Sequence, residues 1–292
     1  MSRQNSGHDS WEQRVEAPRR IWLVADDYGI APGVNAAIRD LVSRRRLNAT
    51  SVMVVAASFD AAEAGSLAAL NAPAQSVAIG LHLTLTAPFR PMSEGFAPNV
   101  DGVFPSLGQM MRAAFLRRLH AGQLAAEIEA QLAAFAASFG HPPAFIDGHR
   151  HVHLLPQIRQ ALIAAAKTKA PQAWLRQCAG TLPVWRKSSS PKGLFIDLLS
   201  RGFARAAGRA CIRTNPSFAG AYEYWPGADF AALFPHFLAG LPEGGVVMCH
   251  PGKVDAELER LDPLTTLREA EYAYLSGPEF PRALAAHGLT LA

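Results

Sequence analysis

The sequence predicts an α/β fold in which parallel strands form a closed or nearly closed barrel. Short apolar runs alternate along the chain with longer segments whose apolar residues have helical spacing. The chain lacks a Gly-x-Gly-x-x-Gly turn, which argues against an open dinucleotide-binding sheet. With 292 residues, 49% of them hydrophobic, it can bury a large core. We therefore expect a TIM-barrel-like (β/α) barrel of seven or eight strands.

The expected elements follow one another in βα order, with two exceptions. Apolar, β-branched runs predict strands at residues 21–25, 50–55, 77–85, 144–147, 173–176, 211–213 and 246–249. Apolar residues three and four positions apart predict helices at 34–45, 59–70, 124–139, 158–169, 230–238, 265–275 and 280–287. The exceptions are residues 87–107, which contain Pro and Gly and are predicted to form an active-site rim, and residues 188–208, predicted to be a helical insertion.

The ends of the chain and its cysteines set the expected context. Residues 1–18 are predicted to be a disordered tail, because they are poor in aliphatic residues, and residues 19–292 a single domain. The tail lacks the apolar segment of a signal peptide, and no later run reaches the ~18 apolar residues of a spanning helix. The three cysteines are far apart, which argues against a disulfide framework. We expect a cytoplasmic protein without a transmembrane segment.

The formal net charge of +4 is spread along the chain, with local concentrations at residues 44–46, 117–118 and 186–187. No aromatic residues interleave with these clusters, so we interpret them as solvated helix ends and expect no nucleic-acid partner. The sequence leaves the oligomeric state open, with a homodimer as one alternative.

Carboxylates and imidazoles accompany three of the predicted strands. Asp26 and Asp27 follow the first strand, His82 lies in the third, and His149 follows the fourth. We expect these side chains to lie close together, because the carboxyl ends of parallel strands meet at one end of a barrel. One carboxylate with two imidazoles can bind a divalent ion and leave positions open for water and substrate. The alternatives are that an Asp caps the next helix and that His82 is a core histidine with satisfied hydrogen bonds.

Two further patterns sharpen this prediction. Neighbouring side chains of a strand point to opposite sides, so that one of the two adjacent carboxylates could bind the ion while the other moves protons. Along residues 147–153, an extended chain would place Asp147, His149, His151 and His153 on one side. Four polar groups are costly to bury unless they have a function, although a solvent-facing turn would also accommodate them.

Arg176 and His250 end two other predicted strands. Arg176 could orient a catalytic carboxylate through charge-assisted hydrogen bonds, or form a salt bridge at the barrel rim. His250 lies where a strand meets a loop, and could act as a general acid or contact the substrate.

These motifs, in this order, resemble the YdjC-like carbohydrate deacetylases, a family that includes chitooligosaccharide deacetylases and hopanoid-biosynthesis-associated deacetylases. The resemblance spans nearly the whole fold and rests on the strings at residues 25–29, 50–54, 80–83, 147–153, 175–176, 248–252 and 268–272. Residues 214–220 further resemble the hopanoid-associated branch. Two departures are Tyr28, where Phe is usual, and Arg150 within the histidine cluster.

The resemblance implies a TIM-barrel-like fold and metal-dependent hydrolysis of an acetyl group from an N-acetylglucosamine-type oligosaccharide or glycolipid. It also implies that Asp27, His82 and His149 bind one divalent ion, Zn²⁺ or Mg²⁺, and that Asp26 is the general base.

The residues themselves suggest the remaining roles. Arg176 would hold Asp26 ionised, and His250 is the first candidate for the acid that protonates the leaving amine, with His151 and His153 behind it. Two other functions fit the same residues: a metal-dependent phosphoesterase, and a non-catalytic carbohydrate-binding protein with a structural metal.

Overall fold

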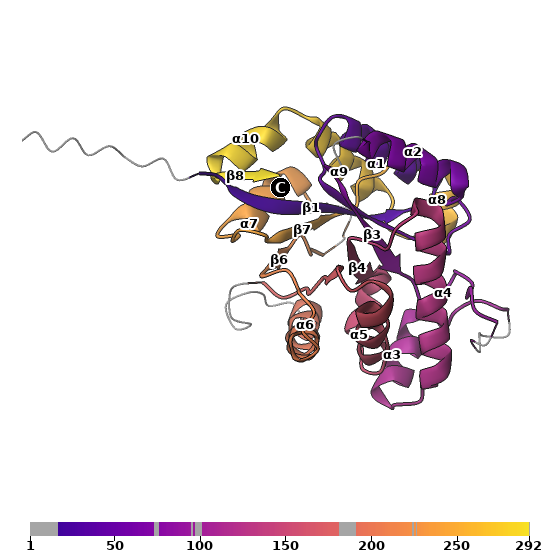
Figure 1. Ribbon diagram of the computed structural model, residues 1–292. Helices are drawn as coiled ribbons and strands as arrows, with labels where there is room; N and C mark the ends of the chain where they lie inside the picture. The colour runs from indigo at the N-terminus through magenta and orange to yellow at the C-terminus, as the bar shows by residue number, and fades with distance from the viewer. Residues whose placement is uncertain are drawn as a thin grey trace, which may run out of the picture.

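A curled, parallel sheet lies at the centre of the molecule (Figure 1). The computed structural model describes residues 17–72, 76–94, 96, 101–180, 191–223, 225 and 227–291. Seven strands pair in the order β5-β4-β3-β2-β1-β7-β6, and β8 pairs with β1. The strands are β1 (Arg19–Tyr28), β2 (Ala49–Val52), β3 (Ala78–Leu83), β4 (Phe145–Gly148), β5 (Trp174–Leu175), β6 (Phe218–Ala219), β7 (Val246–Cys249) and β8 (Leu289–Leu291).

The two edges of the curled sheet are linked through a short irregular segment. Leu175 of β5 forms a parallel bridge with Thr214, and its backbone N donates to Arg213 O at 2.9 Å. Phe218 N of β6 donates to Ala179 O at 3.0 Å. The predicted TIM-barrel-like (β/α) architecture is thereby confirmed.

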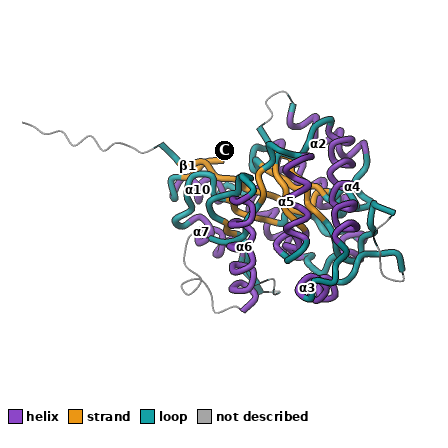
Figure 2. Tube along the Cα trace, turned by 60° about the horizontal axis from the view of Figure 1, so that its bottom comes forward, coloured by secondary structure: helices purple, strands orange, loops and turns teal. Residues whose placement is uncertain are grey.

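Helices surround the strands, with α1 and α2 on one side and α4, α5 and α6 on the other (Figures 1 and 2). They are α1 (Pro32–Ser43), α2 (Ala61–Asn71), α3 (Leu107–Phe115), α4 (Ala121–Phe139), α5 (Ile158–Lys169), α6 (Pro191–Arg209), α7 (Phe230–Leu238), α8 (Ala256–Leu261), α9 (Thr266–Ser276) and α10 (Glu279–Ala286), with the 3₁₀ segment η1 (His149–Leu154). Within the described residues, no helix has both the length and the apolar character needed to cross a membrane.

Most of the predicted elements are present, and one strand is wrong. Residues 211–213 form the turn that ends α6, because Cys211 has a φ of 59° and Ile212 N donates to Ala207 O at 3.0 Å. The strand β6 follows at Phe218–Ala219 instead. The sequence pattern also missed α3, α8 and β8.

Three predicted segments lie partly outside the described residues, among them the predicted rim at 87–107, of which residues 95 and 97–100 are not described. The predicted tail at 1–18 is described only from residue 17, and the insertion at 188–208 only from residue 191, where α6 begins.

Aromatic packing in the barrel explains a glycine that directly precedes the Leu81-His82 pair. Phe145 of β4 stacks on Trp174 of β5 with ring centroids 4.6 Å apart. A Cβ atom at Gly80 would lie only 2.5 Å from Cζ of Phe145. The Phe145 ring cannot move aside without losing the stacking contact, so position 80 requires a residue without a side chain.

We therefore expect Gly80→Ala to lower the free energy of unfolding by about 1–3 kcal/mol, the usual cost of overpacking a core. The matched control is Gly65→Ala on α2, where an added Cβ meets no atom within 4 Å. That change should raise stability by roughly 0.5–1 kcal/mol, because Ala favours a helix over Gly. Denaturant unfolding of both variants checks the pair, and equal effects would contradict the packing argument.

Candidate active site

All six residues predicted to form the site lie at the carboxyl end of the sheet. Three of them belong to β1 and β3, and the others directly follow β4, β5 and β7; they are Asp26, Asp27, His82, His149, Arg176 and His250. Five of these side chains are buried, and that of His250 is 13% exposed. The barrel therefore brings together residues that are up to 224 positions apart, from Asp26 to His250.

An irregularity at the end of β1 directs two adjacent carboxylates into the site. The pairing of β1 with β2 shifts register between Ala25 and Tyr28, and Asp27 has a left-handed φ of 68°. Such a bulge re-aims side chains that strict alternation would send to opposite sides of the sheet. Asp26 and Asp27 consequently both reach the site, although they have different partners there.

The predicted ligands converge on one point. Asp27 Oδ1 lies 3.1 Å from His82 Nε2 and 3.0 Å from His149 Nδ1. One oxygen and two nitrogens that all lie within 4.8 Å of one another match the donor set of a two-histidine, one-carboxylate metal site. The residues present therefore fit a divalent ion with open coordination positions.

Neighbouring groups fix the orientation of this donor set. His82 Nδ1 lies 2.6 Å from Asp147 Oδ1 and 3.0 Å from Ser51 Oγ, so that the ring presents Nε2 to Asp27. A carboxylate behind a histidine is the usual way to fix the tautomer of a metal-binding imidazole. The sequence pattern groups Asp147 with the histidine cluster and does not predict its contact with His82.

A second group, Asp26, His82 and Asp147, is equally close-packed. However, the Arg176 guanidinium lies between its carboxylates, with Nη1 2.5 Å from Asp26 Oδ1 and 2.8 Å from Asp147 Oδ2. The guanidinium occupies the space between these two carboxylates, whereas Asp27 Oδ1 faces two imidazole nitrogens, so a metal ion is better accommodated beside Asp27.

Arg176 holds Asp26 through two parallel hydrogen bonds. Its Nη1 and Nη2 donate to Oδ1 and Oδ2 at 2.5 and 2.7 Å. Burial alone would lower the pKa of Arg176, but the carboxylates of Asp147 and Asp26 raise it, so that the guanidinium stays charged. The sequence-based pairing of Arg176 with Asp26 thus has the geometry expected of a bidentate ion pair.

Helix α9 supplies two buried charges that sequence reasoning did not assign to the site. Arg268 Nη2 donates to Asp27 Oδ2 at 2.7 Å. Glu271 accepts from His250 N at 2.5 Å and from Tyr222 Oη at 2.6 Å. Both charged residues lie on the same helix face as buried Leu275, and this core-facing position was the signal in the sequence.

The charge of Arg268 also affects the ionisation of Asp27. Burial by itself would raise the pKa of this carboxyl group, but Arg268, His149 and His82 together hold it well below its usual value. Asp27 is therefore ionised over the whole neutral range, as a ligand of a cation must be.

The expectation that the histidines at 149, 151 and 153 share one side is wrong. Arg150 and His151 have left-handed φ values of 52° and 57°, which turn the chain into η1 directly after β4. His149 faces Asp27, whereas His153 Nε2 donates to Arg176 O at 2.9 Å. His151 Nδ1 lies 3.5 Å from Cys178 Sγ. Only the first of the three joins the predicted ligand set.

The three histidines that are candidates for protonating the leaving amine are neutral near pH 7. Burial lowers the pKa of His250 to about 4 and that of His153 to about 3, and also lowers the pKa of His151 well below its usual value. His250 lies nearest the predicted base among them, with Nε2 4.0 Å from Asp26 Oδ2.

The segment predicted to be an active-site rim contacts the site through Phe89. The ring of Phe89 packs edge-on against His149, with centroids 5.8 Å apart. Phe104 N donates to Phe89 O at 2.8 Å, and Glu127 of α4 accepts from Met92 N at 3.0 Å. The described part of the rim is thus anchored beside a predicted ligand.

The sequence matches the family model of YdjC-like proteins over residues 20–286, which is most of the chain. The chain belongs to the YdjC-like family. A similar relative is the chitooligosaccharide deacetylase of Yersinia pestis (strain Pestoides F), 28% identical over 268 residues that cover 91% of this chain and 94% of the relative.

Solved structures show that the YdjC-like chain shares its fold with other proteins. A protein of Enterococcus faecalis V583, described as a cellobiose-phosphate cleavage protein, aligns with a TM-score of 0.73 and 21% identity, over 94% of this chain and 97% of that one. The lactam utilization protein of Thermus thermophilus aligns with a TM-score of 0.51 and 18% identity, over 93% of this chain and 98% of that one. Both similarities concern the fold.

The buried carboxyl group of Glu271 should make stability depend on pH. Burial raises its pKa to about 7, from an ordinary value of 4.5. Between these values the folded protein binds more protons than the unfolded chain, so the free energy of unfolding falls as pH rises. A shift of this size corresponds to about 3 kcal/mol.

We expect Glu271→Gln to remove most of the fall in the free energy of unfolding between pH 5 and 8. Denaturant unfolding at each pH, with a chelator present, measures this. Glu279→Gln, which changes an exposed carboxyl group on α10, is the control and should keep the parent profile. Parallel profiles for the Glu271 variant and the parent would show that this carboxyl does not titrate as described.

Proposed function

We propose that this YdjC-like protein is a metal-dependent carbohydrate N-deacetylase. Its substrate would be an N-acetylglucosamine-type sugar in an oligosaccharide or a glycolipid. The observation that carries the proposal is the convergence of Asp27, His82 and His149 beside a second carboxylate, Asp26, that an arginine holds in place. The chitooligosaccharide deacetylase relatives support it. Membership of the hopanoid-associated branch stays a prediction.

One divalent ion would be bound by Asp27, His82 and His149. Two imidazoles in the donor set favour zinc over magnesium, because magnesium prefers oxygen ligands throughout. Such an ion polarises an acyl oxygen and lowers the pKa of a bound water.

Asp26 is proposed to remove the proton from the attacking water. Both of its oxygens accept hydrogen bonds from Arg176, and Oδ1 also accepts from Ser51 Oγ at 3.4 Å, which fixes the carboxylate plane and leaves a lone pair on Oδ2. The full burial of Arg176 keeps this arrangement free of competing solvent.

His250 is proposed to deliver a proton to the leaving amine. Because its pKa is lowered to about 4, the imidazole is neutral between turnovers and must first receive the proton that it delivers. Asp26 Oδ2 lies 4.0 Å from His250 Nε2, so the proton taken from water is released close to that ring. His153 is a weaker candidate, because its Nε2 already donates to Arg176 O.

Two other functions fit the site less well. A two-metal phosphoesterase needs carboxylates for a second ion, but the Arg176 guanidinium already lies between Asp26 and Asp147 and pairs with both. A binding protein with a structural metal would have no use for Asp26, which stands beside the predicted ligands without belonging to them.

The test is acetate release from N-acetylglucosamine oligosaccharides and acetylated glycolipids, with and without chelator. We expect chelator-sensitive acetate release by the parent protein. Asp27→Ala and His149→Ala should lose bound metal together with activity. Asp26→Asn should keep its metal and lose roughly 10²–10⁴-fold in turnover, the usual contribution of a general base.

His141→Ala changes an exposed histidine away from the site and should retain both metal and activity. Phosphate release from phosphoesters without acetate release would favour the phosphoesterase. A chelator-resistant ion and no hydrolysis would favour the binding protein. Stoichiometric metal in the Asp27 and His149 variants would refute the ligand assignment.

Arg268 should strengthen metal binding by orienting Asp27. We expect Arg268→Met to weaken affinity for Zn²⁺ by about 10- to 100-fold, the usual effect of losing a group that orients a ligand. Arg268→Lys should lose less, because an ammonium group can still donate a hydrogen bond to Asp27. Competition with a chromophoric chelator measures the affinity directly.

The matched control is Arg39→Met, which removes another arginine–carboxylate pair, that of Arg39 with Glu63, outside the site. It should leave Zn²⁺ affinity unchanged. An equal loss in both variants would mean that the effect comes from general destabilisation.

A further inference from the structure

Exposed apolar side chains gather where α3 approaches α6. Six large apolar side chains are exposed in the described part of the chain, and three of them lie on these two helices or directly after α3: Phe115 (45%), Leu116 (50%) and Leu198 (68%). The rings of Phe115 and Phe195 lie 5.8 Å apart and join the helices. We call residues 107–120 and 193–209 together the α3–α6 tip.

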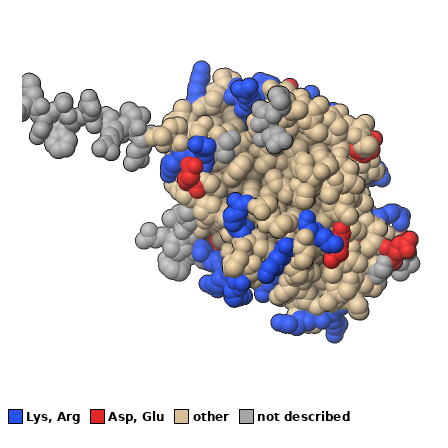
Figure 3. All heavy atoms as spheres, viewed as in Figure 1, with Lys and Arg blue, Asp and Glu red and all other residues tan. Residues whose placement is uncertain are grey.

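The same surface concentrates positive charge. The α3–α6 tip contains six arginines and one acidic residue, Asp197, which is buried and paired with Arg201 at 2.7 Å. Since the whole chain has a formal charge of +4, the remainder of the molecule is close to neutral. Figure 3 shows blue side chains gathered on the lower part of this face, where Figure 1 draws α3, α5 and α6.

Three of the six arginines form a row on α6. On α6, Leu198, Arg201, Arg205 and Arg209 are three or four positions apart and therefore lie along one side of the helix. On the other helix, Arg117 and Arg118 directly follow the exposed Phe115 and Leu116. Exposed apolar side chains thus have basic side chains next to them in both parts of the tip, as on surfaces that bind the membrane interface.

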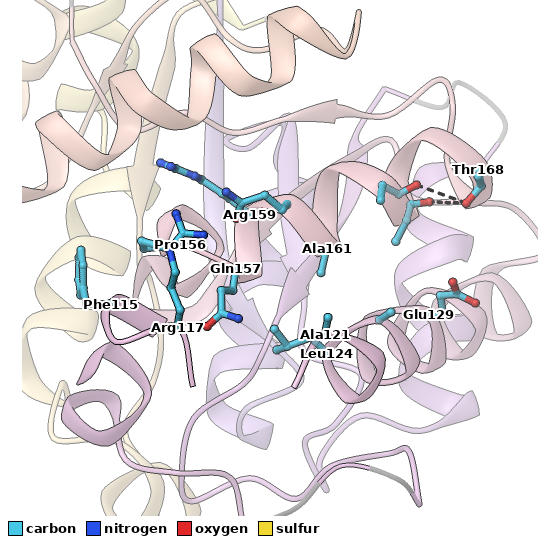
Figure 4. A pocket seen from close by; sticks show the side chains of 14 residues that line it. Phe115, Arg117, Ala121, Leu124, Glu129, Pro156, Gln157, Arg159, Ala161 and Thr168 are labelled. Carbon is cyan, nitrogen blue, oxygen red and sulfur yellow. Dashed lines mark hydrogen bonds between the residues drawn. The ribbon is translucent and has the colours of Figure 1, made fainter. Parts of the chain in front are cut away.

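A groove continues the apolar surface between α4 and α5 (Figure 4). It has a volume of about 680 Å³, and its lining runs from Phe115 along Leu124 and a series of alanines towards Thr168. Arg117 and Arg159 flank the end near Phe115. The groove therefore extends the apolar area of the tip and keeps basic groups beside it.

We propose that the α3–α6 tip docks on an anionic phospholipid surface. Exposed Phe115, Leu116 and Leu198 would enter the interface while the arginines contact phosphate groups. A second copy is a poorer partner, since a symmetric contact would bring two positive surfaces together. Nucleic acid is also a poorer partner, because half-exposed aliphatic side chains gain nothing from its phosphates.

Docking at this surface would place the active site close to the lipid. Both α3 and α6 contact η1, the segment that begins with His149. The inference concerns how the protein is positioned, and it holds whether or not the site removes acetyl groups.

The test is co-sedimentation of the full chain with vesicles of phosphatidylcholine alone and of phosphatidylcholine mixed with phosphatidylglycerol. We expect binding to the anionic vesicles only, weakened by salt. Arg117→Gln/Arg118→Gln should lower the partition coefficient by roughly 10- to 30-fold, because each arginine near an anionic surface contributes about fivefold. Leu116→Ser/Leu198→Ser should lower it about tenfold through lost apolar burial.

Matched controls remove the same kinds of group elsewhere. Arg260→Gln/Arg282→Gln and Leu70→Ser change exposed residues outside the tip, and should bind vesicles like the parent. Thermal unfolding checks that every variant is folded.

Absence of binding to anionic vesicles, or equal losses in the control variants, would overturn the proposal. Dimerisation abolished by Leu116→Ser/Leu198→Ser, without vesicle binding, would replace it with self-association. Because no step requires turnover, a failed deacetylase assay leaves this result interpretable.

Discussion

Two adjacent carboxylates are buried at the end of β1, and each must be neutralised. Asp26 and Asp27 are both only 2% exposed, and each contacts a fully buried arginine, Arg176 or Arg268. Breaking a buried pair by removing one partner typically costs about 3–5 kcal/mol, because the remaining charge has no compensation. Arg176 directly follows β5, and Arg268 lies on α9. The positions of β5 and α9 are therefore coupled to the bulge in β1.

Because Asp26 and Asp27 contact different arginines, the two carboxylates also have different chemical surroundings. Arg176 contacts both oxygens of Asp26, so this group is fixed, and His250 Nε2 stays 4.0 Å away from it. Arg268 contacts only Oδ2 of Asp27, and Oδ1 remains available to His82 and His149. Two identical side chains at successive positions thus acquire the surroundings of a base and of a metal ligand, through the number of oxygens that each arginine engages.

The sequence predicted that these residues converge where the signal was local, and it missed the contacts that depend on tertiary packing. Strand ends marked by Asp26, His82 and Arg176 were enough to bring these residues to one edge of a parallel barrel. The divergence of the histidines after His149 was not predictable, because left-handed backbone at Arg150 is set by packing and not by residue type. Likewise, the charge of the α3–α6 tip comes from segments separated by more than 70 residues.

The cost of burying these groups is itself an argument for a bound cation. Three histidines, four carboxyl groups and two arginines are buried at one edge of a sheet whose remaining core is largely apolar; they are His82, His149, His153, Asp26, Asp27, Asp147, Glu271, Arg176 and Arg268. Apolar residues of similar volume would often stabilise a fold equally well or better. Arg268 pairs with Asp27, whereas Asp26 and Asp147 share Arg176. Against the effect of burial, these carboxylates raise the pKa of His82 to about 10, so that its ring carries the balancing proton. A divalent ion between Asp27, His82 and His149 would replace that proton and bind the imidazole nitrogens.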